Sequence, residues 1–235
     1  MRAFNIQHSA FSIHMCGRYT LRASGGQVAE QFGLADAPQL APRYNIAPTQ
    51  LVPVVRAGAE GRELALLRWG LVPFWAKDLA IGAKMINARS ETVAEKPAFR
   101  AALRQRRCLI LADGFYEWQA TPGGKQPFYF RVGDGAPFAM AGLWESWRGP
   151  DDATVQTCTI LTTRANPLLA PLHDRMPVIL PPDEYRLWLD PSLREAGPLE
   201  HLFDPFPAED MDAYPVGKDV NRVANDSAAL IAPLV

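Results

Sequence analysis

The longest strand-like run in this sequence is CLILADGFYEW, at residues 108–118. Aliphatic residues fill its first half and aromatic residues its second half, which is typical of a buried strand. Six further strand-like runs lie on both sides of it, at residues 51–56, 64–69, 128–132, 138–147, 158–163 and 176–180. Gly123-Gly124 and Asp134-Gly135 lie between such runs and predict hairpins.

Helices are predicted at residues 27–32, 91–106, 167–172 and 183–189. The second has Ser90 as a candidate N-cap and a basic last turn. Strands outnumber helices and do not alternate regularly with them. We therefore expect an α+β fold with a mainly antiparallel, barrel-like β-sheet core and flanking helices.

The composition is that of a globular domain, with 48% hydrophobic and 21% charged residues among 235. No apolar run approaches the roughly 20 residues of a membrane span. The first fourteen residues lack the apolar core of a secretory signal. Three widely spaced cysteines, Cys16, Cys108 and Cys158, argue against a disulfide framework and favour a reducing compartment. These features predict a cytoplasmic protein.

Charge is unevenly distributed although the net charge is −1. Residues 84–131 hold nine basic and four acidic side chains, whereas residues 183–212 hold two basic and nine acidic ones. The basic segment could bind a phosphate backbone or could be a solvated helix face, and charge alone does not decide between them.

Four short segments are unusually polar for their apolar surroundings: residues 16–19, 85–91, 113–118 and 172–177. The first begins with Cys16. If Cys16 were the terminal residue, its amine and thiol together would form a 1,2-aminothiol. Such a group condenses with an aldehyde to an imine and then closes a five-membered thiazolidine.

Three other polar residues have both a chemical and a structural interpretation. Glu117, between two aromatics, is either a desolvated proton-transfer group or a side chain on the wet face of a strand. His173 is either catalytic or structural. Asn87 could cap a helix or stabilise an oxyanion.

Several common kinds of site are missing from the sequence. There is no CxxC motif and no helical His pair, so we expect no metal site, and Cys108 and Cys158 fit plain core residues. There is also no phosphate-binding loop, dinucleotide fingerprint or nucleophile elbow. We therefore expect no cofactor.

Taken together, the motifs resemble those of the SOS response-associated peptidase (SRAP) family, the abasic-site shielding proteins. The resemblance rests on the motifs MCGRY (15–19), RYNIAPT (43–49), RWGLVP (68–73), WAKD (75–78), NARSE (87–91), FR (99–100), GFYEW (114–118), LTT with AN (161–166) and HDRMP (173–177). It implies a single SRAP-type domain over residues 15–235, acting in the DNA damage response.

The resemblance also implies a reaction. The protein would bind abasic sites in single-stranded DNA and form a thiazolidine crosslink through N-terminal Cys16, whose thiolate is the better nucleophile. Glu117 would supply the acid, His173 would assist sugar opening, and Asn87 would position the amine and sugar oxygens. An imine that does not close would permit β-elimination, an abasic-site lyase activity.

The resemblance further assigns residues to DNA binding. Arg18, Arg89 and Arg100 match residues near the phosphates, and Trp75 is a candidate for stacking an exposed base. We expect a monomer that does not bind membranes and is associated with the nucleoid when bound to DNA.

The departure from the family is the N-terminus, because fourteen residues precede Met15. A peptide-bonded Cys16 has no amine. The start codon is misassigned, or the extension is removed by autoproteolysis, or it persists and impairs the protein. Two other functions remain open: a Cys-dependent peptidase with Cys16 as nucleophile and His173 as base, and a non-catalytic single-strand binder.

Overall fold

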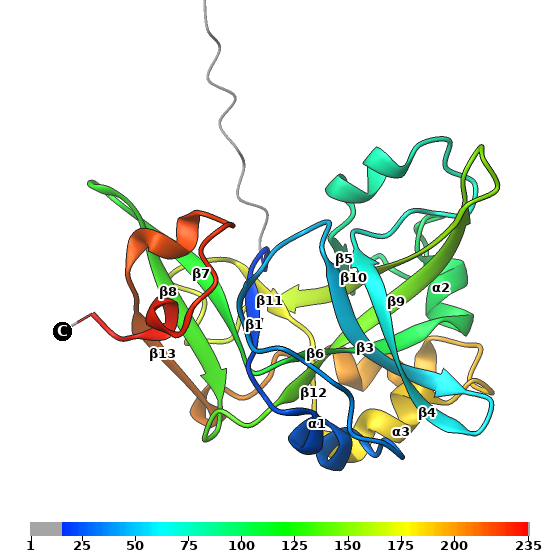
Figure 1. Ribbon diagram of the computed structural model, residues 1–235, viewed down its shortest axis with the longest axis horizontal. Coiled ribbons are helices and arrows are strands. Elements are labelled where there is room, and N and C mark those ends of the chain that lie inside the picture. Colours follow the sequence, from blue (N-terminus) through cyan, green and yellow to red (C-terminus); the bar gives the residue numbers. More distant parts are fainter. Residues whose placement is uncertain (1–15, 235) are drawn as a thin grey trace, which may run out of the picture.

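The computed structural model describes residues 16–234 of the chain. The predicted extension at residues 1–14, together with Met15, lies outside these described residues. Two β-sheets and several short helices make up the fold, and the first described residue, Cys16, lies three residues before strand β1 of the smaller sheet (Figure 1).

The larger sheet closes into a barrel. Its strands pair in the order β10-β4-β3-β6-β9, and β9 pairs again with β10 to complete the ring. All these pairings are antiparallel except β10 with β4. The ring strands are β3 Leu51–Gly58, β4 Gly61–Trp69, β6 Arg107–Ala112, β9 Phe138–Arg148 and β10 Thr154–Arg164. Three short strands extend the sheet: β5 Asn87–Arg89, β11 Arg175–Pro177 and β12 Ile179–Leu180.

The second sheet has five strands in the order β13-β8-β7-β1-β2. They are β1 Tyr19–Leu21, β2 Arg43–Ile46, β7 Gly114–Thr121, β8 Gly124–Val132 and β13 Met211–Pro215. In Figure 1 this sheet lies to the left of the barrel, and β1 lies between the two. The expected α+β fold with a barrel-like, mainly antiparallel core is confirmed.

The run at residues 108–118 connects these two sheets. It is not one strand, because it leaves the barrel at the end of β6 and enters the second sheet at the start of β7. Asp113 alone lies between the two strands. The predicted Gly123-Gly124 hairpin joins β7 to β8, where Thr121 pairs with Gly124.

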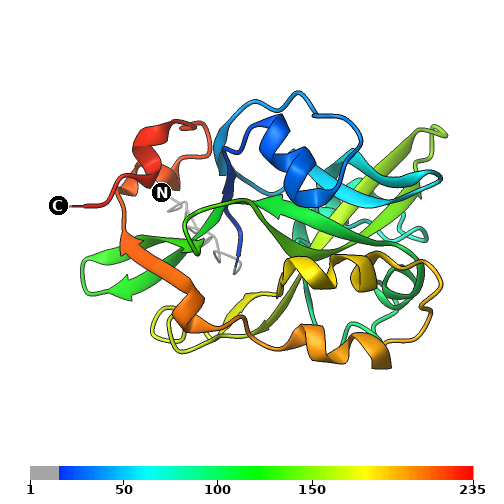
Figure 2. The ribbon, with the colours of Figure 1, turned by 90° about the horizontal axis from the view of Figure 1, so that it is seen from below.

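Helices are short and lie mostly on the underside of the barrel, where Figure 2 shows α1 and α3. The helices are α1 Gly25–Phe32, α2 Arg100–Gln105 and α3 Tyr185–Leu189, with 3-10 turns η1 Leu79–Lys84, η2 Pro182–Glu184, η3 Gly197–Phe203, η4 Ala208–Asp210, η5 Lys218–Asn221 and η6 Ala228–Ile231. A capping box between Ser24 and Gln27 begins α1, and Gly33 ends it at φ 64°, which a residue with a Cβ rarely adopts.

Two predicted helices are wrong in part or in whole. The helix expected at 91–106 forms only as α2, because Pro97 disfavours helical backbone at Lys96 and has no N–H to donate. Residues 167–172 form hydrogen-bonded turns that Asn166 caps through the N–H groups of Leu168 and Leu169.

Other differences concern connections between strands. Asp134-Gly135 makes a turn but no hairpin, because β8 belongs to the second sheet and β9 to the barrel. The strand expected at 176–180 is two strands interrupted at Val178. The analysis of hydrophobic runs missed β1, β2, β5 and β13, which are three to five residues long.

The hydrophobic core fills the barrel and continues under α1 and α3, with Phe32, Trp69 and Trp188 completely buried. Cys108 and Cys158 are also completely buried and free, as expected of core residues. A second cluster packs the C-terminal segment against β7 and β8. Within the described residues, no helix is long and apolar enough to cross a membrane.

The second cluster predicts a stability effect at Leu230, which is 3% exposed and packs with Tyr116 and Trp118. Leu230→Ala should lower the free energy of unfolding by about 2–4 kcal/mol, because truncating a buried leucine leaves a cavity. Leu234→Ala, at a side chain 50% exposed, is the matched control and should change it by less than about 0.5 kcal/mol. Urea unfolding measures both, and equal effects would contradict the packing of this segment.

Candidate functional site

The site centres on Cys16 and Glu117. The backbone N of Cys16 lies 2.5 Å from Glu117 Oε1, and the Cys16 thiol also hydrogen-bonds the same carboxyl group. The two residues are 3% and 2% exposed. One carboxyl group therefore contacts both the nitrogen and the sulfur of Cys16.

Strand pairing creates this contact between residues 101 apart in sequence. β1 runs antiparallel to β7, with Tyr19 opposite Phe115, and the Tyr116 N–H donates to the Arg18 carbonyl at 3.0 Å. Cys16 lies three residues before β1, at φ 50°, and its N–H reaches the side chain of Glu117 on the neighbouring strand β7. Glu117 is buried. Its carboxyl group is therefore desolvated and does not lie on a solvent-exposed face of the strand.

Both groups of the pair have shifted pKa values. Burial raises the pKa of Glu117 to about 7, although hydrogen bonds from Cys16 act in the opposite direction. Burial and the neighbouring Glu117 carboxylate raise the pKa of the Cys16 thiol well above its ordinary value, while Arg175 lowers it. Near neutral pH the thiol therefore keeps its proton, and the carboxyl group can either accept or donate one.

Arg175 is a site residue that the sequence analysis did not single out. Its Nη1 and Nη2 donate to the two Glu91 oxygens at 3.0 and 2.8 Å, and Nη2 also donates to Thr162 O at 2.6 Å. It is 9% exposed, and its charge acts on the Cys16 thiol. The HDRMP motif contains this arginine, but only the fold brings its charge to bear on the Cys16 thiol.

His173 lies two residues before Arg175, between β10 and β11. Its Nδ1 is 2.7 Å from Asp174 Oδ1 and also accepts from the Arg175 backbone N–H at 3.2 Å. Nδ1 cannot do both at once: with a proton it donates to Asp174, and without one it accepts from Arg175. In the second arrangement the ring proton is on Nε2, and His173 then offers an N–H donor on that side.

Asn87 begins β5 and pairs in parallel with Ile160 of β10. It therefore belongs to the end of the barrel sheet that also carries β11, because β10 pairs with both strands. Asn87 caps no helix, since residues 90–95 form turns.

The four predicted DNA-binding residues divide into two kinds. The Arg18 guanidinium is partly buried and donates to Asn45 Oδ1 at 2.8 Å and to Val220 O at 2.7 Å. Trp75, Arg89 and Arg100 are exposed, with half of the Trp75 surface open to solvent. Arg18 thus binds the C-terminal segment, whereas the other three are available at the surface.

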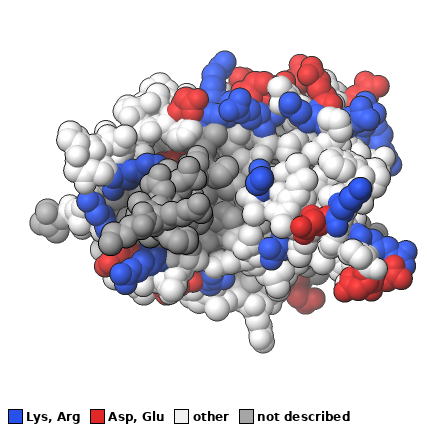
Figure 3. Space-filling view, turned by 90° about the horizontal axis from the view of Figure 1, so that it is seen from above, with Lys and Arg blue, Asp and Glu red and all other residues white. Residues whose placement is uncertain are grey.

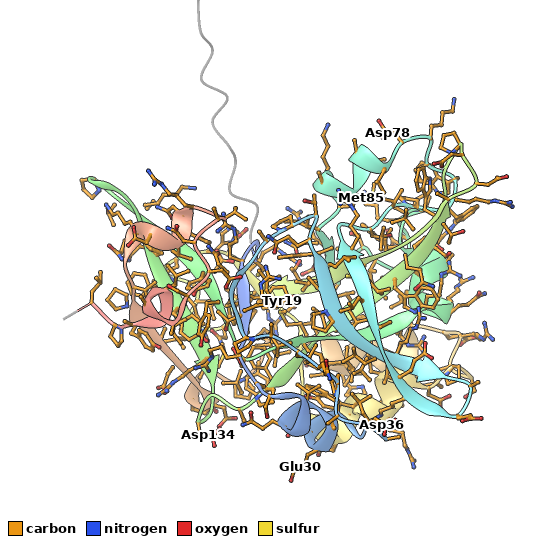
Figure 4. All side chains as sticks on the ribbon, in the orientation of Figure 1. Tyr19, Glu30, Asp36, Asp78, Met85 and Asp134 are labelled. Atoms are coloured by element: carbon orange, nitrogen blue, oxygen red, sulfur yellow. The ribbon has the colours of Figure 1, made fainter. Side chains whose placement is uncertain are left out.

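Trp75 belongs to the segment that leads to Asp78. Figure 4 labels Asp78 and Met85 on the upper side of the barrel, away from α1, and Tyr19 between the two sheets. Trp75 lies three residues before Asp78 and is next to Phe74, which is 62% exposed. Seen from above in Figure 3, Lys and Arg side chains lie around a hollow in this face. Among the described residues, no group of three or more His, Cys, Asp or Glu side chains could hold a metal ion.

Comparisons with known proteins agree with the motifs. The chain matches the family described as SOS response associated peptidase (SRAP) over residues 15–223. The Bacillus subtilis protein named Abasic site processing protein YoqW is 44% identical over 222 residues, covering 92% of this chain and 99% of that protein. Abasic site processing protein HMCES of Xenopus tropicalis is 31% identical, covering 90% of this chain and 72% of that protein. A crystal structure of a Bacteroides thetaiotaomicron protein has a TM-score of 0.84 at 28% identity and covers 94% of this chain and 100% of that one.

The buried Glu117 predicts a pH-dependent stability in the full chain, where Cys16 is peptide-bonded. A carboxyl group whose pKa is higher in the folded than in the unfolded protein stabilises the fold below pH 4.5, and this stability is lost as the pH rises through 7. As the pH rises from 5 to 8, the free energy of unfolding of Glu117→Gln should therefore increase relative to that of the wild type by up to about 3 kcal/mol. Glu30→Gln, on the exposed surface of α1, is the control, and unfolding at both pH values measures the difference. A gain that is the same at pH 5 and pH 8 would contradict the raised pKa.

Proposed function

The chain belongs to the SOS response associated peptidase (SRAP) family, and from this premise we propose that it processes abasic sites in single-stranded DNA by a covalent crosslink through Cys16. The observation that carries the proposal is the single carboxyl group of Glu117 in contact with both the nitrogen and the sulfur of Cys16. These are the two atoms that a thiazolidine joins to an aldehyde carbon.

The reaction requires Cys16 to be the terminal residue. We propose that the working protein begins there, as a single domain, and that the residues before it are absent or removed. The SRAP match starts at residue 15, immediately before Cys16, which supports this. A terminal α-amine has a pKa of about 8, so roughly a tenth of it is neutral at pH 7 and able to attack an aldehyde.

The first step forms an imine. The Cys16 amine adds to C1′ of the ring-opened sugar, and the resulting carbinolamine loses water as its hydroxyl takes a proton from Glu117. A carboxyl group with a pKa of about 7 is partly protonated at neutral pH and can donate this proton.

The second step closes the ring. Loss of water leaves a protonated imine and an ionised Glu117. The Cys16 sulfur then adds to the imine carbon, the C=N electron pair passes to the nitrogen, and the thiol proton passes to Glu117, so Glu117 ends protonated as it began. The thiolate suggested by general cysteine chemistry is not the resting form here, because the thiol pKa is raised. Glu117 therefore acts as acid in the first step and as base in the second.

His173 and Asn87 have supporting roles in this proposal. The proton on His173 Nε2 would pass to the sugar ring oxygen as the ring opens, while Asn87 would orient the amine and the sugar oxygens. If the imine forms but the thiol does not add, loss of a proton from C2′ would eliminate the 3′ phosphate, which is a lyase reaction. The crosslink would be reversed by the same proton transfers in the opposite order.

DNA would bind across the face shown in Figure 3. Arg89 and Arg100 would contact phosphates, and Trp75 would stack on a base, a contact worth about 1–3 kcal/mol in any sequence. Arg18 would act partly through the C-terminal segment that it holds. We further propose that the protein acts as a monomer in the cytoplasm and on the nucleoid.

The crosslink is tested by incubating protein that begins at Cys16, as verified by mass, with a single-stranded oligonucleotide containing one abasic site. A heat-stable adduct should form with the wild type and disappear with Cys16→Ala. Cys108→Ala, at a buried core cysteine, is the matched control and should still form it. Cys16→Ser keeps the amine, so it should form an imine that borohydride traps. Absence of any adduct from the wild type would end the proposal.

Self-cleavage before Cys16 is a second candidate. It is favoured by one observation, the 2.5 Å distance between Glu117 Oε1 and the Cys16 nitrogen, which would be the leaving nitrogen of that peptide bond. If the candidate holds, the purified full chain should lose its first fifteen residues with time, and Cys16→Ala should stay intact. Mass spectrometry follows the change, and a wild-type chain that keeps Met1 after long incubation would exclude self-cleavage.

A further inference from the structure

Asp113 is a buried carboxylate outside the proposed chemistry. It is 1% exposed and lies between β6 and β7, where the chain passes from the barrel into the second sheet. Burying a charge in this way is unfavourable unless the group is fully hydrogen-bonded. The partners of Asp113 therefore indicate what it holds in place.

All side-chain partners of Asp113 belong to β1 or to the residues directly after it. Oδ1 accepts from Thr20 Oγ1 at 2.6 Å and from Arg22 Nε at 3.2 Å. Oδ2 accepts from the backbone N–H groups of Arg22 and Ala23. In addition, the Asp113 N–H donates to the Thr20 carbonyl at 2.9 Å.

A second contact supports the same point. Tyr129 Oη lies 2.9 Å from Thr20 Oγ1 and donates to the Asp113 carbonyl at 3.3 Å. A Cβ at residue 114 would come within 2.0 Å of this hydroxyl, so Gly114 is what allows Tyr129 to reach the junction. Thr20 is thus held from two sides.

β1 needs such support because its own pairing is weak. The strand is three residues long, and only two of its residues pair with β7. Its pairing with β2 is irregular, because the register shifts between Tyr19 and Leu21. A slip of one residue would turn each side chain of a strand to the other face. The register of β1 determines which residue faces Glu117.

We propose that Asp113 is a positioning residue for the crosslinking reaction: it fixes β1 against β7 and thereby holds the Cys16 amine and thiol at Glu117. The inference rests on the proposed function. The spacing of the two contacts supports it, because Cys16 lies four residues before Thr20 and Glu117 four residues after Asp113. Both contacts are therefore offset by one residue, in the same direction, from the β1–β7 pairing in which Thr20 lies opposite Gly114, so a shift of β1 along β7 would displace both.

The test compares Asp113→Asn with the wild type, both beginning at Cys16. The asparagine side chain has nearly the same size as aspartate. Both Asp113 oxygens accept hydrogen bonds, however, so the NH2 group of asparagine must face donors at one of these two positions. The single-turnover rate at saturating abasic oligonucleotide should fall about 10- to 100-fold, because small misplacements of reacting groups have effects of this size. DNA affinity should stay within about twofold. The basic limb of the pH–rate profile, where Glu117 loses the proton that it must donate, should move to higher pH, because Glu117 loses the hydrogen bonds from Cys16 that lower its pKa.

The matched control is Glu145→Gln. Glu145 is also buried, at 5% exposure, and pairs with Arg106 at 2.8 Å on the barrel strand β9. It should lower thermal stability without changing the rate or the pH profile. Thr20→Ser, which keeps the hydroxyl, should react at close to the wild-type rate, and Thr20→Val more slowly.

A second measurement does not depend on crosslinking. Without DNA, alkylation of Cys16 by iodoacetamide should be faster in Asp113→Asn, with buried Cys158 as an internal reference. If rate, pH profile and alkylation all match the wild type, or if Glu145→Gln slows the reaction equally, the inference is overturned. If the wild type forms no adduct, the proposed function fails, and the alkylation rates decide whether Asp113 holds Cys16.

Discussion

The pairing of β1 with β7 is the interaction on which both the fold and the site depend. Residues 108–118 leave the barrel through Asp113 and enter the second sheet as β7, so this one run joins the two sheets. β1 pairs beside it, and Asp113 binds the segment that follows Thr20. The same pairing carries Cys16 to Glu117. The position of β1 along β7 therefore sets both the contacts of Asp113 at the junction of the two sheets and the contact of Cys16 with Glu117.

Burial gives this site its acid–base properties and also makes it unfavourable for folding. Glu117 has a pKa near neutrality because its carboxylate is removed from water, and ionising it in the folded protein costs free energy. Cys16 offsets part of this cost through its hydrogen bonds to the carboxyl group. The same burial keeps the thiol protonated. In the proposed reaction Glu117, with a pKa of about 7, would both donate and accept a proton, so the Cys16 thiol would not need to be ionised beforehand.

The sequence predicted those parts of the structure that depend on local pattern. Long apolar runs predicted the barrel strands β3, β4, β6, β9 and β10 and the sheet strands β7 and β8, because a largely buried strand needs apolar residues along much of its length. Gly123-Gly124 predicted the β7–β8 hairpin correctly. The hairpin predicted at Asp134-Gly135 is wrong, since nothing local indicates which sheet the next strand joins. The helix at 91–106 failed for the opposite reason, because Pro97 outweighed a favourable composition. Short strands such as β1 were missed because three residues carry too little pattern.

The sequence by itself determined the chemical inventory: a cysteine behind a methionine, a glutamate between aromatics, a histidine before an arginine, and motifs specific enough to indicate a family. It also determined the α+β class, because hydrophobic pattern and turn residues act over short distances. Only the tertiary structure decided that Glu117 is buried rather than exposed, that the Arg175 charge acts on the Cys16 thiol, and that Arg18 binds the C-terminal segment. The physical reason is that desolvation and charge interactions depend on which residues meet in space, and the pairing of β1 with β7 joins residues about a hundred apart in the chain.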